Sequence, residues 1–313
     1  MQKLKIKIIN LINLFRSFFE NIFSSRKKTM QFIAYFVFTV LFLIQIAIIL
    51  INNSFYSNFS DDILQYYTIM EDFITSLKNG SFSMFNLNNY FGASFFSDIY
   101  YIPLDIFTFI TFLLSYIMPV ELAYSSTELF KIFIGVMTLA YYFHLKGMQN
   151  RTIFWLSIFY LVSGGMVSYM AFPAFLSMTF YLPLALIVIH FYIKKKLWIV
   201  PVFALILIFY NFYLAYTVLV FTAFAYLLEY FKAGKTRFLK FIKDGVVFFL
   251  LLLLGVLMGA IILLPSINFI LEEAYRSTGA FDAWIINIGS YELQLFQPNI
   301  YIRYLFCHIL LLF

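Results

Sequence analysis

Hydrophobic residues make up 63% of the 313-residue chain and charged residues only 12%, against roughly 45–50% and about 25% in soluble domains. A soluble protein of this length cannot enclose so much apolar surface in one core, so the composition excludes an ordinary soluble domain. The single cysteine, Cys307, excludes a disulfide framework and a thiolate metal cluster. The net charge of +6 does not imply a nucleic-acid partner, because Lys and Arg also gather beside bilayers. We therefore expect an all-α, polytopic transmembrane protein.

Residues 1–30 alternate basic with apolar side chains. The segment is longer and more charged than a secretory signal peptide, and no small-residue cleavage site follows an apolar core. We interpret it as a cytoplasmic, basic amphipathic segment that lies on the inner leaflet of the membrane. Its basic residues are Lys3, Lys5, Lys7, Arg16, Arg26, Lys27 and Lys28.

Seven apolar runs follow this segment, and most approach the roughly 20 residues that a ~30 Å hydrocarbon core requires. We predict spanning helices at about 31–52, 122–146, 152–171, 173–192, 197–211, 214–231 and 245–266. The apolar stretch from 197 to 231 is too long for one span, so we divide it at Asn211.

The run 103–118 is ambiguous, because it begins at a proline, carries Asp105 and stops before another proline. If it spans, the loops 146–151, 193–196 and 232–243 lie outside with their Lys and Arg residues, against the positive-inside rule. If it is instead re-entrant or interfacial, 17 of the 21 Lys and Arg residues lie inside. We therefore predict that this run does not cross the membrane.

This topology describes a multi-pass cell-membrane protein with a cytoplasmic N-terminus. Residues 31–313 form the transmembrane domain, with an external loop at 53–121 and a second external segment at 267–300. The last 13 residues, 301–313, begin another apolar run, which at ~1.5 Å per residue reaches only about 20 Å. We interpret this run as a truncated eighth helix.

The external loop contains an amphipathic helical pattern after Ser60-Asp61-Asp62. Turn residues at Asn79-Gly80-Ser81 end the pattern. For Asp61 and Asp62, N-capping of this helix, worth about 1 kcal/mol, and a functional role are equally good explanations. The apolar face of the pattern consists of Ile63, Tyr66, Tyr67, Met70, Phe73, Ile74 and Leu77.

Several short motifs, in order from about residue 31 to 301, resemble those of the YfhO family of bacterial membrane proteins. The family pattern of Asp, three residues and then Gln-Tyr, on the loop after the first transmembrane helix, matches Asp61 to Tyr66. The further matches are Lys78-Asn79-Gly80-Ser81, Asn86 with Gly92 and Phe95, Tyr100-Tyr101-Ile102-Pro103, Lys131, Asn211 to Tyr216, Leu263-Leu264-Pro265, and Pro298 to Tyr301. Each motif is short, but their order and spacing together are specific.

The resemblance implies a GT-C-like fold and a glycosyltransferase that works at the outer membrane face. Its donor would be a polyprenyl-phosphate-linked sugar, and its acceptor an envelope polymer, as in teichoic acid glycosylation, or a lipid. Asp61 is the candidate general base for the acceptor proton, with Asp62 as the alternate or a helper. Gln65 and Tyr66, in the same motif, are expected at the substrate. The resemblance implies no cofactor and no nucleic acid, and leaves a divalent metal ion at Asp62 open.

Lys131 falls on the family's intramembrane lysine. A lysine within a membrane marks a functional site by default, and we expect this one to help bind the donor phosphate. The alternative is an ion pair with Glu128, three residues earlier on the same helix face. Asn211 and Tyr213, at an outer helix end, are expected to contact lipid or sugar, and placement in the aromatic belt explains them equally well.

Two other functions stay open. A lipid or solute transporter, or a flippase, should have two similar halves with broken helices near the midplane, and the sequence contains no such repeat. The third possibility is an inactive, truncated remnant of the enzyme, because the chain stops within an apolar run.

Overall fold

A computed structural model of the protein describes residues 13–14, 16–52, 66–83, 85–86, 93–94, 104–169, 173–232 and 238–278. The described residues form α-helices and one two-stranded hairpin with four strand residues. The predicted all-α, polytopic membrane architecture is therefore confirmed.

From α5 onward, the helices follow one another with few residues between them. In chain order they are α2 (Arg26–Asn52), α3 (Thr68–Asn79), α5 (Ile106–Leu114), α6 (Val120–Leu145), α7 (Asn150–Leu161), α8 (Gly164–Tyr169), α9 (Pro173–Leu176), α10 (Met178–Ile193), α11 (Ile199–Tyr210), α12 (Phe212–Lys232), α13 (Phe238–Met258) and α14 (Ala260–Thr278). Between α3 and α5, strand β1 (Phe85–Asn86) pairs antiparallel with β2 (Ala93–Ser94).

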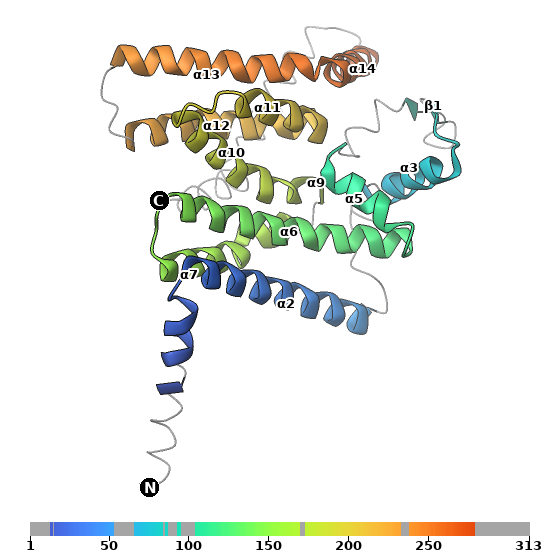
Figure 1. The fold of residues 1–313 in the computed structure, drawn as a ribbon. Coiled ribbons are helices and arrows are strands. Elements are labelled where there is room, and N and C mark those ends of the chain that lie inside the picture. Colours follow the sequence, from blue (N-terminus) through green and yellow to red (C-terminus); the bar gives the residue numbers. More distant parts are fainter. Residues whose placement is uncertain are drawn as a thin grey trace.

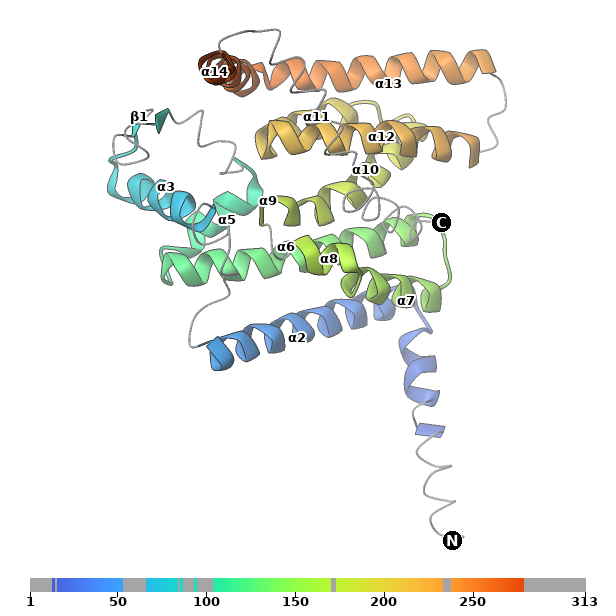
Figure 2. The same cartoon turned by 180° about the vertical axis from the view of Figure 1, so that it is seen from behind.

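The helices lie side by side in layers (Figure 1). The layers run from α2 through α6 and α7 to α10, then to α11 with α12, and finally to α13. At one end of this stack lie α3, α5 and the hairpin, and we call it the loop end. The view from behind shows the α6–α7 connection and the beginning of α13 at the opposite end (Figure 2).

Basic residues gather at that opposite end, which we call the basic end. The Nζ atom of Lys195, in the turn between α10 and α11, lies 3.7 Å from Oδ1 of Asp244 near the start of α13. Lys146 at the end of α6 pairs with Glu229 near the end of α12. These ion pairs join the end of α6 to the end of α12, and the turn between α10 and α11 to the beginning of α13. From α10 to α13, consecutive helices therefore run in alternating directions, as the predicted spans require.

Four described helices are long and apolar enough to cross a bilayer: Arg26–Leu50, Val120–Leu145, Leu214–Phe231 and Lys240–Met258. The other predicted spans consist of shorter pieces. The run 152–171 divides into α7 and α8, the run 173–192 into α9 and α10, and 197–211 forms the 12-residue α11.

The predicted span 245–266 is wrong in its bounds. The chain turns at Gly259, between α13 and α14, and α14 is seen end-on where α13 lies lengthwise (Figure 1). A Cβ atom on Gly259 would lie 2.7 Å from Cγ2 of Ile208, so only glycine allows this close approach of the turn to α11. Counting apolar residues cannot reveal the turn, because the sequence stays apolar on both sides of it.

The first helix begins earlier than predicted. Residues 16–22 are helical, the chain turns at 23–25, and α2 begins at Arg26 rather than at residue 31. The helix before this turn extends away from the stack (Figure 1). Lys27 and Lys28 thus lie in the first turn of α2, where the helix dipole disfavours cations.

Aromatic rings fill much of the interior. Near the basic end, the ring of Phe248 on α13 lies 4.8 Å from that of Tyr192 on α10 and 4.9 Å from that of Tyr226 on α12, measured between centroids. Ring pairs of this kind each add about 0.5–1.5 kcal/mol beyond the burial of their area. The many Phe and Tyr residues therefore hold several helices together.

Candidate functional site

The short helix α5 explains the ambiguous run 103–118. Its nine residues rise about 14 Å, less than half of a ~30 Å hydrocarbon core, which agrees with the prediction that the run does not cross. Asp105 precedes the helix in an extended conformation, and its Oδ1 atom accepts hydrogen bonds of 3.0 Å from the amides of Phe107 and Thr108. Asp105 is therefore the N-cap of α5.

The α6 helix carries a buried ion pair beside this cap. The Nζ atom of Lys131 lies 2.6 Å from Oε1 of Glu128, and the two side chains are 6% and 2% exposed. The same Nζ atom lies 5.8 Å from the ring centroid of Phe107 on α5. The ion pair that the sequence left as an alternative to phosphate binding is thus present.

Asp105 belongs to the same buried polar group. Burial raises the pKa of its carboxyl above the ordinary range, and the nearby Lys131 cation and the two cap amides oppose that shift. Its second oxygen, Oδ2, lies 3.5 Å from the hydroxyl of Tyr181 on α10, a long hydrogen bond. Lys131 thus forms an ion pair with Glu128 and acts on the Asp105 carboxyl only as a nearby charge.

A pair of tyrosines extends this group to the α11–α12 break. The rings of Tyr181 and Tyr210 lie 4.5 Å apart between centroids, and both side chains are fully buried. Asn211 directly follows Tyr210, and its Oδ1 atom accepts a 3.0 Å hydrogen bond from the amide of Leu214. We call Asp105, Glu128, Lys131, Tyr181, Tyr210 and Asn211 the buried polar layer.

The α3 helix covers the loop end next to this layer. The ammonium of Lys78 donates a 2.6 Å hydrogen bond to the carbonyl of Ser115 at the end of α5. On its apolar face, Met70 and Ile74 are buried with Tyr124 of α6, as the amphipathic pattern predicted. The helix ends at Gly80, whose φ of +65° is the left-handed conformation that favours glycine.

The predicted catalytic residues lie outside the described part of the chain. This holds for Asp61, Asp62 and Gln65, which precede α3 by a few residues. Tyr66 is described, and its half-buried ring packs against the main core. Tyr213 lies in the first turn of α12, but its side chain is not among those described.

Sequence reasoning missed Asp105 and Tyr181 as members of the site. A carboxyl inside an apolar run is the signal that could have identified Asp105, by the same rule that selected Lys131. Tyr181 gives no such signal, because one tyrosine in an aromatic-rich chain is unremarkable until the fold places it against Asp105, 76 positions away.

A second polar network lies at the basic end and ties helices together. The hydroxyl of Tyr142 on α6 donates a 2.8 Å hydrogen bond to Glu229 on α12, which also pairs with Lys146. Asp244 on α13 similarly receives a 3.3 Å hydrogen bond from Tyr230. Each carboxylate here has a cation and a tyrosine as partners, an arrangement that stabilises packing.

The described residues contain no group of three His, Cys, Asp or Glu side chains that could hold a metal ion. A metal site that includes Asp61 or Asp62 would involve residues outside the described part of the chain. The buried polar layer itself contains one cation, at Lys131, and the hydroxyls of Tyr181 and Tyr210.

Comparison with known proteins identifies one family. Neither the curated proteins nor the solved structures include a significant match to this chain. The family described as bacterial membrane protein YfhO matches residues 30–313, nearly the whole chain. That match covers every motif on which the resemblance rested, from Asp61 to Tyr301. The chain therefore belongs to the YfhO family of bacterial membrane proteins.

Proposed function

We propose that the protein is a membrane glycosyltransferase that transfers a sugar from a polyprenyl-phosphate donor to an acceptor of the cell envelope. The observation that carries the proposal is the buried polar layer of a YfhO-family membrane protein, whose Lys131–Glu128 pair lies on α6, the helix against which α3 packs through Tyr124. Ionisable side chains are costly inside a membrane protein and are retained where a substrate needs them.

The proposed orientation puts the basic end in the cytoplasm and the loop end outside. The positive-inside rule supports it, because the loops at the basic end contain Lys146, Arg151 and the three lysines 194–196. A lipid-linked donor would then lie with its polyprenyl chain in the bilayer and its sugar at the loop end, next to α3.

The reaction breaks the bond between the anomeric carbon and a phosphate oxygen, whose electron pair leaves with the polyprenyl phosphate. The oxygen of an acceptor hydroxyl forms the new bond, and its proton passes to a carboxylate. We assign that base to Asp61, with Asp62 as the alternate, since both precede in the sequence α3, the helix at the loop end. Gln65, Tyr66 and Tyr213 complete the proposed substrate contacts.

Lys131 is proposed to stabilise the departing phosphate. An ammonium has three N–H donors, and Glu128 accepts one of them at 2.6 Å. A phosphate oxygen that reaches the layer would accept another, while Asp105, held towards its neutral form by burial, adds little repulsion. Asn211 belongs to the same layer, and its side chain caps α12 through the amide of Leu214.

The test is transfer by the purified protein in proteoliposomes. A panel of polyprenyl-phosphate sugars, labelled in the sugar, is supplied with an envelope-polymer fraction, and the label on the polymer is measured. The proposal predicts transfer from at least one donor. Movement of the intact donor across the bilayer, without transfer from any of them, would instead support the transporter alternative.

A further inference from the structure

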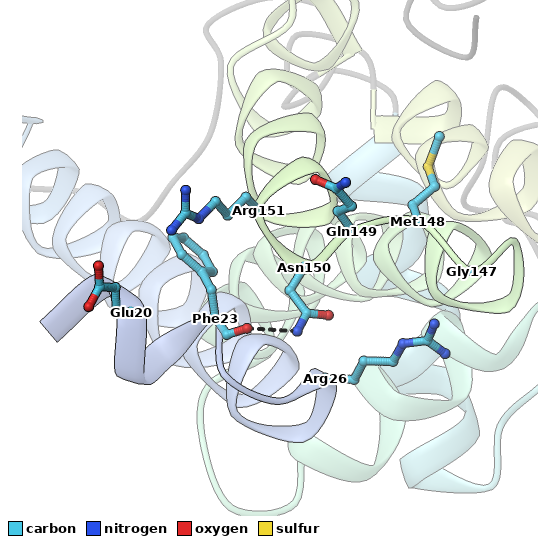
Figure 3. Close-up of a pocket in the computed structure, with 8 residues that line it drawn as sticks. All are labelled: Glu20, Phe23, Arg26, Gly147, Met148, Gln149, Asn150 and Arg151. Carbon is cyan, nitrogen blue, oxygen red and sulfur yellow. Dashed lines mark hydrogen bonds between the residues drawn. The ribbon is translucent and has the colours of Figure 1, made fainter. Parts of the chain in front are cut away.

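The geometry points to a binding site for the phosphate headgroup of an anionic phospholipid at the basic end, independent of the proposed activity. A cavity of about 530 Å³ opens there between the turn that precedes α2 and the α6–α7 connection. Figure 3 shows Arg26 on one side of Asn150 and Arg151 on the other. The lining also includes Glu20, Phe23, Gly147, Met148 and Gln149.

The charge of the cavity favours an anion. Glu20 is its one acidic residue, and its Oε1 atom lies 3.0 Å from Nε of Arg16, which compensates that charge. Within the described part of the chain, neither Arg26 nor Arg151 forms an ion pair. Arg151 lies over the ring of Phe23, 6.0 Å from its centroid. Two guanidinium groups, each a planar fork of donors, match phosphate oxygens.

The backbone adds donors to the same place. The α7 helix begins at Asn150, and Gln149 before it does not cap the helix with its side chain. The first amides of a helix have no intrahelical acceptor, and its dipole favours an anion there. Asn150 fixes the wall of the cavity, because its Nδ2 atom donates a 2.9 Å hydrogen bond to the carbonyl of Phe23 (Figure 3).

The exposed aromatic side chains near the cavity favour a lipid over a free anion as its ligand. Below the cavity, α2 and α7 pack against each other and expose aromatic rings: Phe36 is 37% exposed, and Trp155 and Phe159 are each 53% exposed. In a membrane protein, these rings face acyl chains, and aromatic side chains concentrate at the bilayer interface. A phospholipid with its phosphate in the cavity would thus place its acyl chains against α2 and α7.

Native mass spectrometry of the full chain in detergent, with added phosphatidylglycerol, tests the proposal. Arg26→Gln with Arg151→Gln should weaken lipid binding by roughly tenfold or more, because each interfacial cation contributes to anionic-lipid affinity. The control is Lys194→Gln with Lys196→Gln, which removes the same charge from exposed positions at the same end, outside the cavity. This control should retain the binding of the unmodified protein.

Two results would overturn the proposal. One is equal loss of lipid in both double variants, which would mean a diffuse charge effect. The other is complete displacement of phosphatidylglycerol by millimolar inorganic phosphate, which would make the cavity a site for a free anion. We expect both double variants to fold, because none of the four side chains is buried. Melting followed by circular dichroism checks this.

Discussion

The Nζ atom of Lys131 lies 2.6 Å from Oε1 of Glu128, one helical turn earlier, and neither side chain is more than 6% exposed. Removing one partner of such a pair leaves an uncompensated buried charge, whereas removing both does not. We predict that Lys131→Met lowers the free energy of unfolding by roughly 3–5 kcal/mol, and that adding Glu128→Gln restores part of the loss. Unfolding in mixed detergent micelles measures both variants. Equal stability of Lys131→Met and the unmodified protein would contradict the buried pair.

Stability should also depend on the ionisation of Asp105. Burial raises the pKa of this carboxyl in the folded protein above its ordinary value of 3.8. The unfolded chain therefore ionises first, and the contribution of Asp105 to folding stability falls as the pH rises above that value. Asp105→Asn keeps an N-capping side chain but cannot ionise.

The prediction for Asp105→Asn concerns the difference between its free energy of unfolding and that of the unmodified protein. The unfolding free energy of Asp105→Asn, relative to the unmodified protein, should increase as the pH is raised from about 4 to about 8. Denaturant titrations across that range measure it. A constant difference would mean that folding does not shift the pKa of the carboxyl, and a decreasing difference would mean that the carboxyl ionises more easily in the folded protein; either result would contradict the prediction.

Close packing of α13 against α11 depends on Gly255. A Cβ atom at this position would lie 2.2 Å from the carbonyl oxygen of Pro201, and backbone on both helices would have to shift. We predict that Gly255→Ala destabilises the protein by roughly 1–3 kcal/mol, as overpacking does in other cores. Gly245→Ala, on the same helix, is the matched control, because its Cβ atom would meet the ring of Tyr226 at an ordinary 3.5 Å.

The contact between Lys78 and Ser115 should hold α3 in place. A hydrogen bond from a charged donor contributes about 1.5–3 kcal/mol, and this one joins α3 to the end of α5 at 2.6 Å. Lys78→Met should therefore speed amide hydrogen exchange within α3 by about tenfold or more. Amides of α12 should exchange as before, and an unchanged rate in α3 would show that its apolar face alone holds it.

Membrane orientation is tested by labelling single cysteines in a Cys307→Ser background. Lys195→Cys, in the exposed turn between α10 and α11, should react with a membrane-impermeant maleimide only from the cytoplasmic side. Ser81→Cys, exposed directly after α3, should react only from outside. Labelling of both positions from the same side would mean that the segment with α5 crosses the membrane.

Much of the architecture could be predicted from apolar runs and charge. The positions of Lys and Arg in the loops predict that the run 103–118 does not cross, and the nine-residue length of α5 agrees with this prediction. The turn at Gly259 could not be predicted, because its cause is contact with Ile208 on another helix. Hydropathy measures a segment's affinity for a bilayer, and not the point at which a neighbouring helix makes it turn.

The buried polar layer could be predicted only in part. Lys131 and Glu128 are three residues apart on one helix, so the sequence alone identifies the pair. Asp105 and Tyr181 meet through packing of α5 and α10, which no local pattern records. Asn211 was selected for its place at a helix break, and its side chain proves to cap α12 through Leu214.

The most direct measurement is sugar transfer by Asp61→Asn and Asp62→Asn in proteoliposomes, with Asp72→Asn on α3 as the control. Loss of a general base lowers the rate by roughly 10²–10⁴-fold, so one of the first two variants should lose at least a hundredfold while the control stays near the unmodified rate. Both variants must bind the donor and fold as the unmodified protein does. Full activity in Asp61→Asn and in Asp62→Asn would contradict the proposed role of this loop in catalysis.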